Sequence, residues 1–422
     1  MTSPSPVWRP FFQHALEPDP PTVVRAQGAY LHTSDGRALL DAISSWWVTT
    51  HGHGHPRIVA AIREAAESLD QVIFASVTHE PAERLARELV ALAPAGLTHV
   101  FYSDSGSTAV EVALKMALGA FSNRGVARTK IVAMEGAYHG DTIGTMSVGE
   151  RGVFNAPYAP LLFEVGRIPF PAAGREQATL DAFEALARAG DVAALIVEPL
   201  VLGAGGMRIY TPQVLAELKR IAEKHGAYFI ADEVMTGWGR TGTLFACEQA
   251  GVSPDILCAS KGLTGGAVPL AATLASEEIF AAHHSSDRAK TFFHSSSYTA
   301  NPIACAAAVA NLEIWREEPV TERIAALSRW QAARIRRFEG DPRFRAPRAC
   351  GTIAAVDLAV PDPGYLAEVG LKLRRFFLER GLLLRPLGDT LYAMPPYCVT
   401  EAELDRVFDA FEEAADVAGL VR

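Results

Sequence analysis

Short apolar runs alternate with helical stretches between about residue 58 and residue 300. The helical stretches include Ile58–Leu69 and Glu80–Leu92, where apolar side chains recur every three or four positions. The apolar runs are too short for helices and favour buried strands at His99–Tyr102, Lys130–Met134, Ala193–Val197, Tyr228–Ala231 and Ile256–Ala259. This alternation predicts an α/β fold with a large, doubly wound and mostly parallel sheet.

The two ends of the chain differ from this central part. Residues 1–57 are rich in Pro, Gly and aromatic residues and contain a predicted hairpin around Asp35. After the helical segment Ile303–Arg316 come an Arg-rich helix, short strands and a final amphipathic helix. Because Pro302 suits the start of a helix, we place a boundary there. We expect residues 58–302 to form a large domain, and residues 1–57 and 303–422 to combine into a smaller α+β domain.

Composition then narrows the class of protein. The chain has 422 residues, of which 49% are hydrophobic and 21% charged, as in an ordinary soluble enzyme. The formal net charge of −9 argues against a nucleic-acid or anionic-membrane partner. The start of the chain, Met1–Pro6, lacks a basic segment followed by an apolar one, and the chain has no apolar window long enough to span a membrane. We expect a cytoplasmic enzyme that acts on small molecules.

Cysteine and histidine positions argue against a disulfide framework and a metal site. Five widely spaced cysteines fit a reducing compartment. His51, His53 and His55 alternate as metal ligands on a strand do, but no Cys, Asp or Glu lies close by in sequence to complete a site. We therefore predict no metal.

Two ionisable residues follow predicted strands. Lys261 comes directly after the run that ends at Ser260, and Asp232 follows Tyr228–Ala231. Open α/β sheets bind ligands at the carboxyl ends of their strands. A lysine there can form a Schiff base, and an aspartate can pair with a protonated pyridine nitrogen, which are the groups that pyridoxal phosphate chemistry needs most. Taken singly, the lysine is more often a solvated loop charge and the aspartate a helix cap or turn residue.

Further segments bear on the same chemistry. A strand leads into Asp104–Thr108 and then a helix, so Gly106 and Ser107 can cradle a phosphate, although a plain helix cap is the alternative. Neither a Gly-x-Gly-x-x-Gly motif nor a Walker lysine occurs, which disfavours a dinucleotide or a nucleoside triphosphate. Tyr138 can stack on a planar cofactor and Val234 can cover its other face, while a packed tyrosine in a turn remains the alternative.

The remaining candidates concern substrate and phosphate. Arg385 ends an apolar run and can bind a carboxylate with two parallel hydrogen bonds, or be a surface charge. Trp46 and Trp47 suggest an aromatic wall or buried core residues. The hydroxyl-rich segment His294–Asn301 is equally consistent with a phosphate contact and with an exposed loop.

Taken together, these segments resemble the class III aminotransferases, which have the fold of the fold-type I pyridoxal-phosphate enzymes. The resemblance covers roughly residues 8–400, and its most specific parts are Asp232–Val234 running into Gly237–Gly242, and Ser260–Gly262. It implies pyridoxal 5′-phosphate as cofactor and a homodimer with shared active sites.

The resemblance also implies roles for single residues. Lys261 would carry the cofactor, Asp232 would bind the pyridine nitrogen, and Gly106 with Ser107 would bind the phosphate. The other implied contacts fall on the ring faces (Tyr138 and Val234), the phosphate of the neighbouring subunit (Ser296 and Ser297) and the substrate (Phe11, Trp46, Tyr138, Ser295, Arg385 and Tyr392).

Within the family, stretches such as Ile43–Trp47 and Phe101–Ser107 resemble the branch that acts in biotin synthesis. That branch transfers an amino group to 8-amino-7-oxononanoate, usually from S-adenosylmethionine and in some relatives from lysine. Two departures bear on substrate choice: Ser295-Ser296-Ser297 replaces Gly-Pro-Thr, and Phe11 replaces a tyrosine. The alternatives are an aminotransferase for ornithine, acetylornithine or γ-aminobutyrate, or a non-catalytic binding protein on the same fold.

Overall fold

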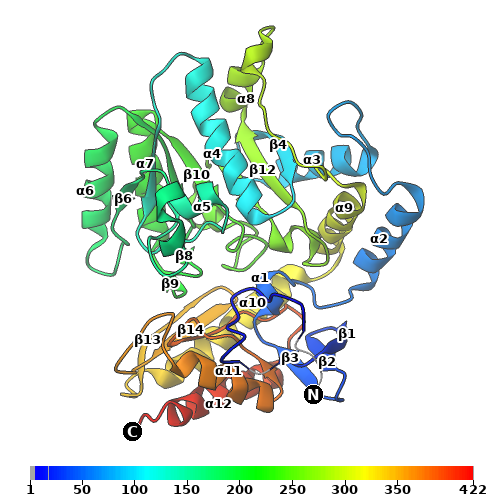
Figure 1. The fold of residues 1–422 in the computed structure, drawn as a ribbon, viewed down its shortest axis with the longest axis vertical. Helices are drawn as coiled ribbons and strands as arrows, with labels where there is room; N and C mark the ends of the chain where they lie inside the picture. Colours follow the sequence, from blue (N-terminus) through cyan, green and yellow to red (C-terminus); the bar gives the residue numbers. More distant parts are fainter. Residues whose placement is uncertain (1–4, 18, 422) are drawn as a thin grey trace.

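The computed structural model describes residues 5–17 and 19–421, so the segment Met1–Pro4, which bears on the prediction of no leader peptide, lies outside the described residues. The chain folds into an upper and a lower part, and both termini lie in the lower one (Figure 1). Within the described residues, no helix is long and apolar enough to cross a membrane.

A seven-stranded sheet forms the centre of the upper part. Its spatial order is β4 (Leu97–Ser103), β12 (Ala271–Ser276), β11 (Ile256–Ala259), β10 (Tyr228–Asp232), β7 (Val192–Val197), β5 (Lys130–Met134) and β6 (Gly166–Ile168). β12 pairs antiparallel with both of its neighbours, whereas the described pairings among the other strands are parallel. The predicted mostly parallel sheet is confirmed. The sequence analysis missed β12, which is rich in small residues, and the three-residue β6.

The apolar runs form strands because both faces of the sheet are covered. Ile131, Ile196 and Ile230 pack with helix α4 (Gly106–Asn123), whereas Leu195 and Phe229 belong to the core on the opposite face. Side chains alternate between the two faces along a strand, so burial on both faces makes the whole run apolar. The other helices of this part are α2 (Pro56–Ser68), α3 (Glu80–Leu92), α5 (Ile143–Val148), α6 (Glu176–Ala187), α7 (Pro212–His225), α8 (Glu277–His283) and α9 (Pro302–Glu317).

The lower part combines residues from both ends of the chain. One sheet has the order β1 (Val23–Gln27), β2 (Tyr30–Thr33), β3 (Ala38–Asp41) and β15 (Leu382–Leu383), so an N-terminal strand pairs with a C-terminal one. The predicted hairpin around Asp35 joins β2 to β3. A second sheet contains β13 (Phe344–Cys350), β14 (Ile353–Leu358) and β16 (Thr390–Ala393), accompanied by α10 (Val320–Ile335), α11 (Val369–Glu379) and α12 (Glu401–Val417). The exact division at residues 57 and 302 stays a prediction.

Candidate active site

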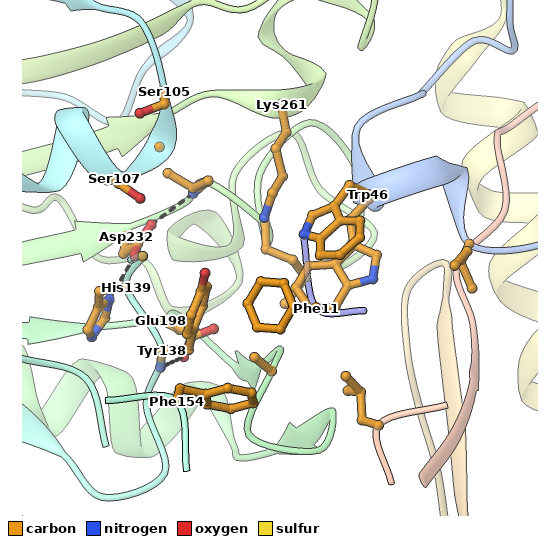
Figure 2. A pocket seen from close by; sticks show the side chains of 18 of the residues that line it. Phe11, Trp46, Ser105, Ser107, Tyr138, His139, Phe154, Glu198, Asp232 and Lys261 are labelled. Carbon is orange, nitrogen blue, oxygen red and sulfur yellow. Dashed lines mark hydrogen bonds and ion pairs between the residues drawn. The ribbon is translucent and has the colours of Figure 1, made fainter. Parts of the chain in front are cut away.

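A pocket lies where the carboxyl ends of the central strands meet the lower part of the molecule. Its volume is about 180 Å³, and its wall combines residues far apart in sequence. The residues that line the pocket include Phe11, Trp46, Trp47, Gly106, Ser107, Tyr138, His139, Glu198, Asp232, Val234, Lys261, Arg385 and Tyr392. Figure 2 shows the Lys261 side chain extending between Asp232 on one side and Trp46 with Phe11 on the other. The central sheet and the lower part together therefore bring most of the predicted site residues into one pocket.

Lys261 follows β11 and lies at the centre of the pocket. Its φ of +48° is in the left-handed region, which a non-glycine residue adopts only when the surrounding structure imposes it. The amine lies 4.8 Å from the centre of the Trp47 ring. Loss of hydration in this apolar setting lowers the pKa of the Lys261 amine to about 8, although nearby carboxylates act in the opposite direction. A substantial fraction of the amine is therefore neutral near physiological pH and can act as a nucleophile or a base.

Asp232 ends β10 and is held by two protein groups. Its Oδ1 accepts the backbone N–H of Val234 at 3.1 Å, and its Oδ2 lies 2.7 Å from His139 Nδ1 (Figure 2). Both the carboxylate and the imidazole are under 5% exposed. These contacts fix the orientation of the carboxylate in the pocket. His139 Nε2 is buried and has no hydrogen-bond partner within the described residues.

The first turn of α4 forms the side of the pocket next to Asp232. Ser105 caps the helix through its side chain, which accepts the backbone N–H of Thr108, and the Thr108 hydroxyl in turn accepts the Ser105 N–H. This capping box occupies the Thr108 N–H and leaves the N–H groups of Gly106 and Ser107, with the Ser107 hydroxyl, at the pocket. A Cβ on Gly106 would lie 2.6 Å from Val234 Cγ1, so only glycine lets the helix start approach Val234 this closely.

A second buried carboxylate, Glu198, braces Tyr138 on the same side of the pocket as Asp232. Its Oε1 accepts the backbone N–H of Tyr138 and its Oε2 that of Gly203, each at 2.9 Å. Burial raises the pKa of the Glu198 carboxyl to about 7. Neither Glu198 nor His139 was predicted from the sequence as a residue of the site. Glu198 directly follows a predicted strand, as Asp232 does, so the same signal was present; His139 is adjacent to Tyr138 but carried no signal of its own.

The aromatic wall comes from a strained turn and from the N-terminal segment. Ser44, Ser45 and Trp47 all have positive φ within α1 (Ser44–Trp47), which points Trp46 toward the pocket while Trp47 is buried. Trp46 is 46% exposed, and its ring centre lies 5.8 Å from that of Phe11. This wall is apolar but open.

Arg385 and Tyr392 complete the pocket from the C-terminal part of the chain. The Arg385 guanidinium lies 5.5 Å from the centre of the Trp46 ring and donates to the backbone carbonyl of Phe11. Burial lowers the pKa of Arg385 from its ordinary value. Tyr392 accepts a hydrogen bond from the indole N–H of Trp47 at 2.9 Å. A guanidinium thus closes the aromatic side of the pocket and is available to an anion.

Ser295, Ser296 and Ser297 do not line this pocket. The Ser296 hydroxyl accepts the backbone N–H of Tyr298, and the backbone carbonyl of Ser297 accepts a hydrogen bond from Gln71. A role for these serines in the active site of the same subunit therefore has no support here.

The alternating histidines have separate partners. His51 contacts Asn311 at 2.8 Å, His53 contacts Asp41 at 2.8 Å, and His55 contacts Glu318 at 3.1 Å. Among the described residues, no three or more His, Cys, Asp or Glu side chains are arranged to hold a metal.

The donor set fits pyridoxal phosphate. A partly neutral amine, a fixed carboxylate, a helix start with free N–H groups and a narrow slot beside Val234 meet in one pocket. An amine can bind the aldehyde, a carboxylate the pyridinium, and a helix N-terminus the phosphate.

Comparison with known proteins identifies the family. The sequence pattern described as "Aminotransferase class-III" matches residues 13–415, nearly the whole chain. The chain belongs to the class-III aminotransferases. It is 50% identical to adenosylmethionine-8-amino-7-oxononanoate aminotransferase of Synechococcus elongatus, over 97% of this chain and 98% of that protein.

Solved structures agree with this assignment. The adenosylmethionine-8-amino-7-oxononanoate aminotransferase of Methanocaldococcus jannaschii superposes with a TM-score of 0.92 at 33% identity, covering 97% of each chain. An amine transaminase from an uncultivated Pseudomonas species, solved in its PLP-bound form, gives a TM-score of 0.90 at 30% identity, covering 98% of this chain and 99% of that one. The fold prediction is thereby confirmed, and the chain is a pyridoxal-phosphate-dependent aminotransferase of the fold-type I architecture.

Proposed function

We propose that this class-III aminotransferase transfers an amino group to 8-amino-7-oxononanoate to give 7,8-diaminononanoate, with S-adenosylmethionine as the amino donor, in biotin biosynthesis. The observation that carries the proposal is the placement of one guanidinium, Arg385, against Trp46 and Phe11 in the pocket that holds Lys261. The acceptor is a long aliphatic chain that ends in a carboxylate. An apolar wall closed by a single cation matches that chemistry. The high identity to a relative that carries this name supports the same assignment.

Each residue acts through its own chemistry. Gly106 and Ser107 would hold the phosphate at the start of α4, Asp232 would hold the proton of the pyridine nitrogen, and Tyr138 and Val234 would cover the two faces of the ring. When bound, pyridoxal phosphate supplies an aldehyde for covalent attachment and a ring that accepts electrons. The Lys261 amine, when it is not linked to the cofactor, would act as the base that takes the proton from the amino-bearing carbon of the substrate, and as the acid that returns it on the cofactor side of that nitrogen.

Substrate selection uses the other side of the pocket. Arg385 would bind the carboxylate of the acceptor with two parallel hydrogen bonds, while Trp46 and Phe11 exclude water from its aliphatic chain. Tyr392 holds the indole of Trp47 beside the Lys261 amine. Because Phe11 has no hydroxyl, it offers apolar contact and no hydrogen bond to the donor.

We also propose that the enzyme is a homodimer in the cytoplasm. Ser295, Ser296 and Ser297 do not line the pocket of their own chain, and Ser295 and Ser297 are exposed, which supports a contact of this segment with the cofactor phosphate and the substrate of the neighbouring subunit. The five cysteines are unpaired, which fits a reducing compartment.

One assay tests the function. Purified enzyme is supplied with 8-amino-7-oxononanoate and, in parallel, S-adenosylmethionine, lysine or ornithine, and 7,8-diaminononanoate is measured by mass spectrometry. We expect product with S-adenosylmethionine. Product with lysine alone would move the assignment to the lysine-dependent relatives. In a parallel arm, a short keto acid replaces 8-amino-7-oxononanoate, and faster transfer to it from ornithine or γ-aminobutyrate would replace the proposal by the generic ω-aminotransferase function.

A further inference from the structure

The Arg348 side chain joins the C-terminal sheet to a loop of the upper part. On its own sheet, Nη1 and Nη2 form a two-pronged pair with the carboxylate of Asp357, at 3.1 and 2.7 Å. Toward the loop, Nε donates to the backbone carbonyl of Met207 at 2.9 Å and Nη2 to that of Gly206. That loop connects β8 (Val201–Leu202) to β9 (Arg208–Ile209). One largely buried guanidinium therefore holds both parts of the molecule.

A bulge in β13 places Arg348 where it can reach both Asp357 and the loop. Arg345 is opposite Asp357, but Arg348 is opposite Ala355, so three steps on β13 correspond to two on β14. Because opposite residues share a face, this bulge puts Arg345 and Arg348 on the face of Asp357. Arg345 donates to the backbone carbonyl of Leu358 and lies 3.5 Å from Asp389, and within the described residues it contacts no residue of the loop, so it serves as a control.

From Met207 a line of hydrogen bonds leads into the pocket. The Met207 N–H donates to the carbonyl of Gly203, whose own N–H donates to Glu198, each at 2.9 Å. Glu198 in turn accepts the N–H of Tyr138. Met207 is fully buried with φ +49°, a conformation that the surrounding structure has to hold in place. Arg348 holds the carbonyl of this residue.

The same pair also contacts the strand that carries Tyr392. The hydroxyl of Thr390 on β16 donates to Asp357 Oδ1 at 2.8 Å. Tyr392, two residues further along β16, lines the pocket. The Asp357–Arg348 pair is thus hydrogen-bonded to Thr390, two residues before Tyr392 on one wall of the pocket, and to the Met207 loop, which leads through Gly203 to Glu198 on the other.

We propose that Arg348, fixed by Asp357, is a positioning residue that sets the Glu198–Tyr138 wall of the pocket relative to the Tyr392 wall. It contacts neither cofactor nor substrate and acts through the backbone of the Gly203–Met207 loop. The inference rests on the membership of the aminotransferase family and not on the identity of the amino acceptor.

The first test follows the backbone rather than activity. Hydrogen exchange is measured on the full-length protein, with and without pyridoxal phosphate, for Arg348→Met and for the control Arg345→Met. We expect exchange at the Tyr138 and Gly203 amides to accelerate about tenfold in Arg348→Met, the scale of one lost hydrogen bond to a charged group. The control should exchange as the wild type does. Unchanged exchange at both amides in Arg348→Met would overturn the proposal.

A second variant, Arg348→Lys, tests the same proposal if Arg348→Met fails to fold. Lysine keeps the charge on the strand but cannot bridge the carboxylate and two carbonyls at once. We expect its exchange rates at the two amides to lie between those of the wild type and Arg348→Met. Wild-type exchange rates in Arg348→Lys would show that the several donors of the guanidinium are not needed, which would contradict the proposed role.

A double-mutant cycle tests whether Arg348 acts through Glu198. The dissociation constant of pyridoxal phosphate is measured by fluorescence titration for Arg348→Met, Glu198→Gln and the double variant. Each single change should weaken binding by about tenfold, and the double variant should be no more than about threefold weaker than the worse single one. Effects that multiply would mean that the two residues act independently, which contradicts the proposal.

Discussion

The two walls of the pocket differ in how they are built. On the cofactor side, Asp232, His139 and Glu198 are each under 5% exposed, and each is held by a hydrogen bond from a neighbouring strand end or loop. On the substrate side, Trp46 and Phe11 are 46% and 38% exposed. The first wall consists of fixed polar groups and the second of accessible apolar surface. This difference predicts that changes on the cofactor side reduce the chemical step, whereas changes on the substrate side alter affinity and selectivity.

Lys261→Ala gives the largest expected effect on the cofactor side. The variant should still bind pyridoxal phosphate through the phosphate and ring contacts, but without a covalent link, and should lose nearly all turnover. Absorbance spectroscopy separates the bound, unlinked cofactor from the linked one. A variant that keeps the spectrum of the linked cofactor and its activity would assign the covalent link to another lysine.

Asp232→Asn should leave the fold intact and reduce turnover by more than about 100-fold. The lost ionic hydrogen bond alone corresponds to roughly 1.5–3 kcal/mol, and the pyridinium that it stabilises is needed throughout the reaction. Single-turnover kinetics measure the proton-transfer step, and circular dichroism checks the fold. Normal turnover would remove Asp232 from its assigned role.

The pH dependence of cofactor attachment probes the setting of Lys261. Only the neutral amine attacks the aldehyde, and burial lowers the pKa of the Lys261 amine to about 8, below the ordinary value of a lysine. The rate of covalent capture by the cofactor-free enzyme should therefore rise with pH and level off above pH 8. Below that midpoint the neutral fraction falls about tenfold for each pH unit. A midpoint near that of a free lysine would show that the amine is hydrated.

Arg385→Ala tests the substrate side. The KM for the keto acid should rise by roughly 10- to 100-fold, the scale of one ionic, two-pronged contact of about 1.5–3 kcal/mol. Arg385→Lys should recover part of this loss, because lysine keeps the charge but makes no two-pronged contact. The half reaction with S-adenosylmethionine alone should change much less.

The Arg385→Ala variant also tests whether the two walls of the pocket have different roles. If Arg385→Ala slows the donor half reaction as severely as the acceptor one, the arginine serves both substrates. The substrate side would then be a general structural element, and the assignment to the long-chain keto acid would lose its main support.

The hydrophobic pattern alone located five of the seven strands described in the central sheet, and with them the position of its chemistry. Runs such as Lys130–Met134 and Ile256–Ala259 are strands at the predicted residues, because burial on both faces makes all of their positions except Lys130 apolar. Lys261 and Asp232 were found because the carboxyl ends of parallel strands share one edge of the sheet. Local pattern and topology were sufficient for this half of the site.

The hydrogen-bond partners of these groups depend on how distant parts of the chain pack together. The bond between Glu198 and the Tyr138 N–H, the pair of Asp232 with His139, and the contact of Arg385 with the carbonyl of Phe11 join residues that are distant in sequence. The same holds for the bulge that turns Arg348 toward the Met207 loop. The periodicity of a sequence reports which side chains are buried, but it carries no information on which distant backbone group each polar side chain meets.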